Sequence, residues 1–201
     1  MDKIRIAVVY HSGSGHTRTV AKHLATAMQH PHSEINLLSI DEDDIMEKLH
    51  EADTIVFGCP TYFGNESAAF KSFMEKTGTF WYRQLWKDKL AAAFTTSSTT
   101  NGDKLNTLVS LALFAAQHSM IWISQGILPR YINDQQTDGQ NRMGSFLGLM
   151  TQTDNSIREV SALHPGDSLT IELFGRRILD ITQAFKGNAA YAVALPQTKK
   201  I

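Results

Sequence analysis

The segment Val8–Leu24, VVYHSGSGHTRTVAKHL, joins two different patterns. The apolar, β-branched run Lys3–Tyr10 predicts a strand that is buried on both faces, and apolar positions between Gly15 and Met28 mark one side of a helix. The turn between them holds two glycines and three hydroxyl residues. A strand that turns directly into a helix leaves unpaired amide N–H groups at the positive end of the helix dipole, where anions bind. We therefore expect this turn to bind a phosphate group.

The spacing within the turn narrows the kind of phosphate site. A dinucleotide fingerprint needs glycine at the position of Arg18, and a P-loop needs a lysine that this turn lacks. The residues fit the pattern [ST]-x-[ST]-G-x-[ST] instead: Ser12, Gly13, Ser14, Gly15, His16 and Thr17. This pattern resembles the phosphate loop of flavodoxin-like proteins, and the resemblance implies that these six residues bind the monophosphate of FMN. The alternative is an ordinary Gly/Ser turn in which Ser14 caps the helix.

Length, charge and cysteine content limit the class of protein. The 201 residues suit one α/β domain, and 19 basic against 20 acidic residues give a formal net charge of −1. Such a balance offers no field for binding a nucleic-acid backbone, and it lacks the acidic coat of many small electron carriers. The single cysteine, Cys59, excludes an internal disulfide and a thiolate metal cluster, and fits a reducing compartment such as the cytoplasm. No segment has the roughly 20 apolar residues of a membrane span, and the N-terminus does not read as a signal peptide.

Strand and helix patterns alternate along the chain. After the first pair, we expect strands at 34–40, 53–60, 89–97 and 120–124, and helices at 43–52, 68–77 and 103–118, with a last helix between Asp167 and Gly187. This alternation predicts an α/β fold with a parallel sheet between two helical layers. The flavodoxin-like resemblance implies a three-layer sandwich with five parallel strands in the order 2-1-3-4-5 and a ligand beyond their carboxyl ends. We assign residues 1–187 to one domain with a long connection at 126–166, and residues 188–201 to a C-terminal tail.

The loop after the third strand carries the most specific resemblance. Its residues are Pro60, Thr61, Tyr62, Phe63, Gly64 and Asn65, followed by Ser67, Phe73, Thr77, Gly78 and Trp81. They are similar to the P-T-R-F-G-N and T-G-x-[LF]-W signature of WrbA-type NAD(P)H:quinone oxidoreductases, which have arginine at the position of Tyr62. The resemblance implies that residues 60–64 bind the polar edge of a flavin and that Tyr62 and Trp81 border its open face. In the alternative interpretation, Tyr62, Phe63 and Trp81 are core aromatics.

Polar residues also follow the fourth strand and the helix after it. The loop there consists of Thr96, Ser97, Ser98, Thr99, Thr100 and Asn101, which suit a polar lining better than a helix interior. The WrbA-type family has a glycine-rich segment here, so the resemblance implies that these residues contact FMN; a Ser/Thr linker that caps the next helix is the alternative. His118 matches a family histidine that approaches the flavin, although a histidine at a helix C-terminus is also a favourable partner of the helix dipole.

These features predict an FMN-dependent oxidoreductase with His118, Trp81 and Tyr62 beside the flavin. It would take a hydride from NADH or NADPH and pass two electrons to a quinone-like acceptor. Two other classes stay open, a flavodoxin-type electron carrier that is not an enzyme and a flavodoxin-like adaptor without flavin. The long connection at 126–166 predicts a homo-oligomer, either a dimer or a tetramer.

Overall fold

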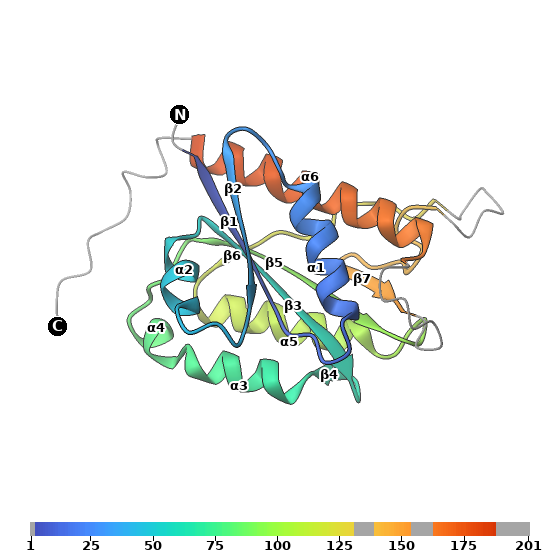
Figure 1. Ribbon diagram of the computed structural model, residues 1–201, viewed down its shortest axis with the longest axis horizontal. Coiled ribbons are helices and arrows are strands. Elements are labelled where there is room, and N and C mark those ends of the chain that lie inside the picture. Colours follow the sequence, from blue (N-terminus) through green and yellow to red (C-terminus); the bar gives the residue numbers. More distant parts are fainter. Residues whose placement is uncertain (1–2, 131–138, 154–162, 188–201) are drawn as a thin grey trace.

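Parallel strands joined by helices form the centre of the molecule (Figure 1). The computed structural model describes residues 3–130, 139–153 and 163–187. The strands are β1 (Ile4–Tyr10), β2 (Ser33–Ser39), β3 (Thr54–Tyr62), β4 (Asn65–Glu66), β5 (Leu90–Ser97), β6 (Ile121–Trp122) and β7 (Leu149–Gln152). They form one sheet in the order β2-β1-β3-β5-β6, with β4 paired to β3 and β7 paired to β5. This confirms the predicted order, because β5 and β6 are the fourth and fifth strands expected from the sequence.

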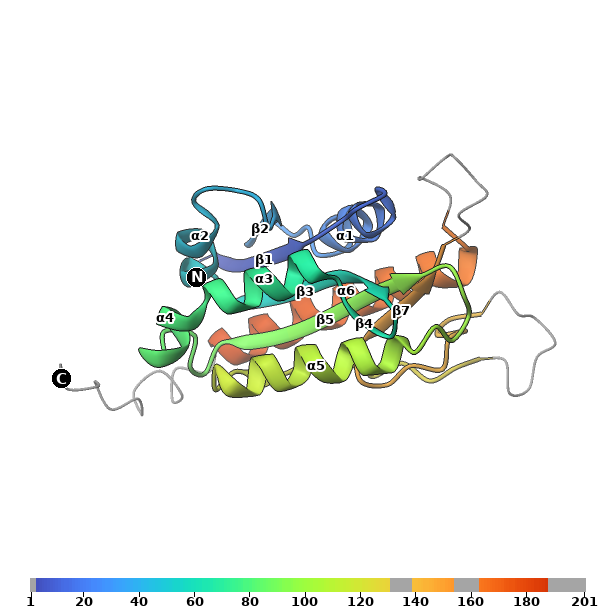
Figure 2. The same cartoon turned by 90° about the horizontal axis from the view of Figure 1, so that it is seen from below.

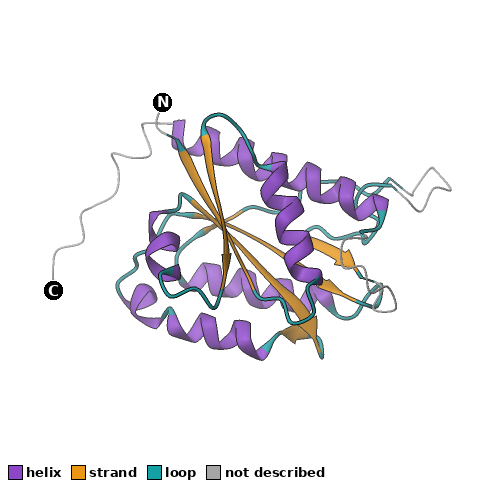
Figure 3. Ribbon diagram, in the orientation of Figure 1, coloured by secondary structure: helices purple, strands orange, loops and turns teal. Residues whose placement is uncertain are grey.

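Helices cover both faces of the sheet, as Figures 2 and 3 show. They are α1 (His16–Ala27), α2 (Ile45–Glu51), α3 (Ala68–Lys76), α4 (Gly78–Tyr82), α5 (Lys104–Gln117) and α6 (Pro165–Gly187). Successive residues of β1 point to opposite faces of the sheet. Ile6 and Val8 belong to the hydrophobic core that includes Leu24 of α1 and Phe174 of α6. Val9 belongs to the core on the other face, under α2, α3 and α5. None of the helices in the described ranges is long and apolar enough to cross a membrane.

The fifth strand expected from the sequence is divided in two. β6 lies beside Leu90 and Ala91 at the amino end of β5. β7 continues the same edge beside the carboxyl half of β5, from Phe94 to Ser97. The expected count of five strands is therefore wrong, because the structure has seven in the sheet, including one within the connection at 126–166 and the short antiparallel β4.

Asn141 holds part of this connection in place. Its side-chain amide donates hydrogen bonds to the carbonyl oxygens of Ile127 and Ser145, at 2.7 and 2.8 Å, and its Oδ1 accepts one from the Ser145 amide. These bonds satisfy buried backbone groups between β6 and β7. The C-terminal tail at 188–201 and residues 131–138 and 154–162 of the connection lie outside the described residues.

The last helix begins two residues earlier than Asp167, which was the expected cap. Asp167 lies inside the first turn, where both carboxylate oxygens accept hydrogen bonds from Arg142, at 2.7 and 2.9 Å, and one also accepts from the Gln152 amide. The carboxylate therefore ties α6 to the segment around β7 instead of capping its own helix.

Candidate functional site

The strand register brings three loops to one edge of the sheet. Tyr10 is paired with Gly58, and Pro60 with Thr96, which is paired in turn with Thr151. The carboxyl ends of β1, β3, β5 and β7 therefore lie together. The loops that leave β1, β3 and β5 all start from this edge, as the sequence predicted.

The loop after β1 presents backbone donors. α1 begins at His16, and its N-cap is Gly15, whose φ of 99° lies in the left-handed region. Ser12, not Ser14, organises the turn: its Oγ accepts hydrogen bonds from the amides of Gly15 and Arg18, both at 3.1 Å. Among the described residues, the amides of Gly13, Ser14, His16 and Thr17 have no acceptor. These free N–H groups at a helix N-terminus suit a phosphate.

The loop after β3 touches the loop after β1. The Tyr62 hydroxyl lies 2.9 Å from the point that a Cβ on Gly13 would occupy. A larger residue at position 13 would therefore displace the Tyr62 hydroxyl, and the tyrosine is half-exposed at the opening. Phe63, which has a φ of 50°, projects fully into solvent. Neither side chain is a core aromatic.

The loop after β3 also touches the loop after β5. Gly64 has a φ of 78°, and a Cβ on it would lie 3.5 Å from Cβ of Asp103. Asn106 of α5 donates a hydrogen bond to the Gly64 carbonyl at 2.9 Å. The three loops thus form one continuous rim, with Tyr62 and Gly64 as the links.

A buried layer of threonines supports this rim. Thr61 Oγ1 lies 2.7 Å from Oγ1 of Thr95 and 2.8 Å from Oγ1 of Thr107, and the Thr95 hydroxyl donates to the Cys59 carbonyl. Thr96 is also buried, and its hydroxyl donates to the Thr151 carbonyl. The side chains of Thr61 and Thr96 therefore face the core, although both were expected to line the site. Pro60 is buried as well.

The other residues predicted to bind FMN in these three loops lie at the surface of the rim. Eight of them are exposed: Gly13, Ser14, Tyr62, Phe63, Ser98, Thr99, Thr100 and Asn101. Five are partly buried: Ser12, Gly15, His16, Gly64 and Ser97. Thr17 is buried, so its side chain does not line the exposed part of the rim.

Trp81 and His118 lie at the opposite edge of the sheet. α3 and α5 both start near the rim and run away from it, so α4, which carries Trp81, and the C-cap His118 follow at the far ends of these helices (Figure 1). Ile121, three residues after His118, is paired with Leu90, the first residue of β5. The expectation that Trp81 and His118 border the same opening as Tyr62 does not hold within one chain. They line a separate groove of about 400 Å³ between α3, α4 and α5.

His118 is a buried, neutral residue in this chain. It packs against the rings of Trp86 and Phe114, at centroid distances of 4.5 and 4.8 Å. The Thr77 hydroxyl donates to the Met74 carbonyl, so the bond of 2.9 Å between Thr77 and His118 requires Nε2 of the imidazole to donate. Nδ1 is buried without a partner in the described part of the chain, and burial lowers the pKa of His118 to about 4.

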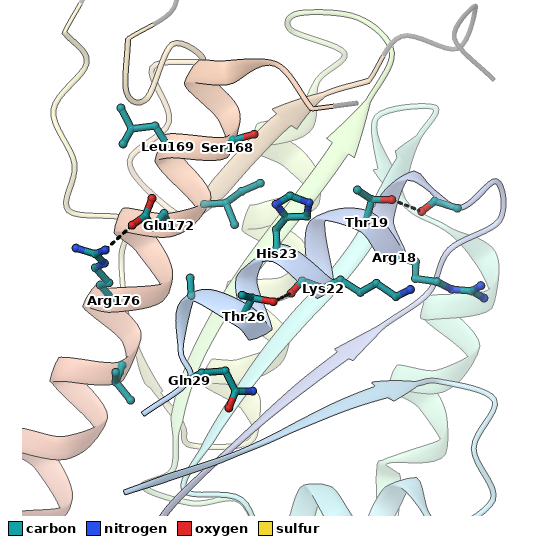
Figure 4. Close-up of a pocket in the computed structure, with 14 residues that line it drawn as sticks. Arg18, Thr19, Lys22, His23, Thr26, Gln29, Ser168, Leu169, Glu172 and Arg176 are labelled. Carbon is teal, nitrogen blue, oxygen red and sulfur yellow. Dashed lines mark hydrogen bonds and ion pairs between the residues drawn. The ribbon is translucent and has the colours of Figure 1, made fainter. Parts of the chain in front are cut away.

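A large groove lies away from the rim. It has a volume of about 1270 Å³, runs along the outer surface of the packed helices α1 and α6, and meets the rim at Gly15. Figure 4 shows His23 and Thr26 on one side and Leu169 and Glu172 on the other, where Glu172 is paired with Arg176. Side chains of α1 and α6 line most of this groove. The backbone amides without acceptors, which suit a phosphate, lie at the rim instead. The described residues contain no cluster of side chains suited to hold a metal ion.

Fold, loop positions and sequence agree with one family. A family model described as NADPH-dependent FMN reductase matches residues 4–129, and the chain belongs to this family, in the class of flavodoxin-like α/β proteins. Among curated relatives, the chain is 33% identical over 179 residues to the flavodoxin FldP of Pseudomonas aeruginosa, covering 89% of this chain and 97% of that protein. It is also 30% identical over 141 residues to an NAD(P)H dehydrogenase (quinone) of Archaeoglobus fulgidus, covering 58% of this chain and 74% of that one.

A solved structure of similar sequence has the same fold. The flavodoxin, WrbA-like protein from Agrobacterium tumefaciens matches with a TM-score of 0.72 and 32% identity, over 91% of this chain and 99% of the other. An FMN-bound flavodoxin of Fusobacterium nucleatum, at 13% identity and a TM-score of 0.61, shares the fold alone. These likenesses confirm the resemblance that the three loop sequences indicated.

Proposed function

We propose that this chain is an FMN-dependent oxidoreductase that takes a hydride from NADH or NADPH and passes two electrons to a quinone-like acceptor. The observation that carries the proposal is the continuous rim, in which Tyr62 meets Gly13 and Gly64 meets Asp103 at the carboxyl edge of the sheet. Family membership and the likeness to a quinone dehydrogenase support it.

The loop after β1 would hold the phosphate of FMN. Four amides, from Gly13, Ser14, His16 and Thr17, lack acceptors in the described structure, and the positive end of the α1 dipole adds to their attraction. Ser12 keeps the turn in shape by accepting two backbone bonds. A Cβ at position 13 would lie 2.9 Å from the Tyr62 hydroxyl, so the glycine lets Tyr62 lie close to this loop. The residues present therefore fit a monophosphate.

The loops after β3 and β5 would hold the ring system. FMN, when bound, supplies the redox chemistry, so the protein needs to bind and orient it. Tyr62 and Phe63 offer exposed aromatic surface for stacking, and the loop Ser98–Asn101 offers polar groups on the other side. An open ring face beside Tyr62 would admit the nicotinamide and then the acceptor in turn.

A non-enzymatic electron carrier is the second candidate, and the likeness to the flavodoxin FldP favours it. The near-zero net charge speaks against it, because a carrier that docks on many partners through charge usually bears an excess of one sign. The two functions differ in a simple assay. The protein loaded with FMN is mixed with NADPH or NADH and benzoquinone, and oxidation of the nicotinamide is followed at 340 nm. Steady turnover supports the oxidoreductase; tight FMN binding without turnover supports the carrier.

A further inference from the structure

A lysine is fully buried directly behind the loop that follows β5. Lys104 is the first residue of α5 and has an exposed fraction of 0%. Its side chain turns back under the preceding loop, and Nζ donates hydrogen bonds to the Ser97 hydroxyl at 2.9 Å, the Thr99 carbonyl at 2.6 Å and the Thr100 carbonyl at 2.9 Å. All three donors of the ammonium group are therefore directed at this one loop.

The ammonium group has no carboxylate partner in the described part of the chain. The nearby acid, Asp167, forms an ion pair with Arg142. Asp167 raises the pKa of Lys104 and Arg142 lowers it, so their effects oppose each other. Burial lowers the pKa of Lys104 to about 8. A buried charge without a counter-ion lowers stability, and an apolar side chain of similar volume is often tolerated better at such a place. Stability of the core alone thus gives little reason for a lysine here.

Lys104 turns two carbonyl groups of the loop, those of Thr99 and Thr100, toward Nζ. The two preceding carbonyls, of Ser97 and Ser98, are held instead by the Thr153 amide and the Gln152 side chain. A carbonyl and the N–H of the next residue point in opposite directions across a planar peptide. The amides of Thr100 and Asn101 therefore point away from Nζ, and neither has an acceptor in the described ranges.

We propose that Lys104 is a positioning residue that holds this loop so that the amides of Thr100 and Asn101 face outward as donors for a planar ring with acceptor atoms at its edge. With the function proposed above, on which this inference rests, that ring is the flavin, whose carbonyl oxygens and ring nitrogens accept hydrogen bonds. Lys104 acts through the loop and does not touch the ligand. The Ser and Thr side chains of this loop, which the sequence predicted to contact the flavin, would then contribute less to binding than the backbone amides.

The test compares the affinity for FMN with the affinity for riboflavin, each measured by quenching of flavin fluorescence. Lys104→Met leaves the Thr99 and Thr100 carbonyls without the donor that orients them, so both affinities are expected to fall by the same factor, about tenfold or more. Ser14→Ala, at the phosphate loop, is expected to weaken FMN and leave riboflavin unchanged. Lys89→Met is the matched control, because Lys89 also donates to two carbonyls, those of His50 and Ala52, but at the opposite edge of the sheet. It should leave both affinities unchanged.

One further measurement keeps the inference testable if Lys104→Met does not fold. In Lys104→Gln, cleavage of the ligand-free loop at 98–103 by subtilisin is expected to be faster than in the wild type. Unchanged affinities in a folded Lys104→Met or unchanged cleavage would each overturn the positioning role. Failure of the wild type to bind either flavin would instead overturn the proposed function, and the cleavage experiment would still decide the role of Lys104.

Discussion

The Tyr62 hydroxyl lies directly over Gly13, 2.9 Å from the point where a β-carbon on that glycine would stand. Gly13 belongs to the loop after β1, and Tyr62 is the last residue of β3, where the expected ring-binding loop begins. One close contact therefore couples the expected phosphate loop to the start of the expected ring-binding loop. The WrbA-type signature has arginine at the position of Tyr62. The tyrosine of this chain therefore changes the shape of the site where it lies against Gly13.

A double substitution tests this coupling. Gly13→Ala is expected to weaken FMN binding severalfold, because the new methyl group is too close to the Tyr62 hydroxyl and the tyrosine side chain must turn away from its place in the site. Tyr62→Phe removes the hydroxyl and leaves the nearest ring carbon at 4.0 Å, an ordinary contact. Titration calorimetry should therefore show that Gly13→Ala is much milder when combined with Tyr62→Phe. Equal losses in both backgrounds would mean that the contact does not shape the site.

The phosphate loop gives a second prediction. Ser14→Ala removes an exposed hydroxyl beside the free amides, and the expected loss of FMN affinity corresponds to roughly 1.5–3 kcal/mol, the range for a hydrogen bond to a charged group. Thr17→Ala should cost less, because the Thr17 side chain is buried. The same titrations with riboflavin, which lacks the phosphate, serve as the control. A loss of riboflavin affinity as large as that of FMN would place the phosphate elsewhere.

The buried imidazole of His118 predicts acid sensitivity. Its pKa in the folded protein is about 4, below the value near 6.5 expected in the unfolded chain. Between these values the unfolded chain binds a proton that the folded chain does not, so stability falls as the pH drops from 6.5 to 4. The contribution is on the order of 3 kcal/mol.

Urea unfolding at several pH values measures this contribution. His118→Gln keeps a donor for Thr77 but does not titrate, so its stability should depend less on pH in that window than the stability of the wild type. His23→Gln, which changes an exposed histidine, is the control and should behave like the wild type. If His118→Gln and the wild type lose the same stability, His118 is not buried and neutral as described.

An exposed apolar stripe on α5 supports the proposal of a homo-oligomer. Leu105, Val109 and Leu113 recur every four residues on the outer face of the helix, and all three are exposed. Sedimentation at micromolar concentration should give a species heavier than the 22.4 kDa chain. Val109→Glu combined with Leu113→Glu should shift it toward the monomer, while Lys87→Glu should not. A wild-type monomer would contradict the proposal.

The alternation of strands and helices could be predicted because it depends on local patterns, whereas the order of the strands was implied by the resemblance to flavodoxin-like proteins. The β-branched run before Ser12 and the alternation of strand and helix identify the strands, and parallel crossovers limit how they are arranged. The division of the last strand could not be predicted, since β7 has four residues and is placed by pairing with β5 across more than fifty positions of sequence. Its stability comes from contacts such as those of Asn141, which leave no periodic signal.

The candidate site was predicted at the level of loops better than at the level of side chains. Motif spacing located the three loops, but a loop sequence does not say which hydroxyls face inward, as those of Thr61 and Thr96 do. Lys104 was missed because a lysine in the first turn of a helix usually lies in solvent. Trp81 and His118 were placed at the rim by resemblance, whereas the lengths of α3 and α5 carry them to the other edge.

The most direct test of the account is a crystal structure of the protein grown with FMN. The account predicts the phosphate against the amides of Gly13 and Ser14, and the ring between Tyr62 and the loop Ser98–Asn101. FMN bound in the groove along α1 and α6, or a rim without flavin at saturating concentration, would contradict it.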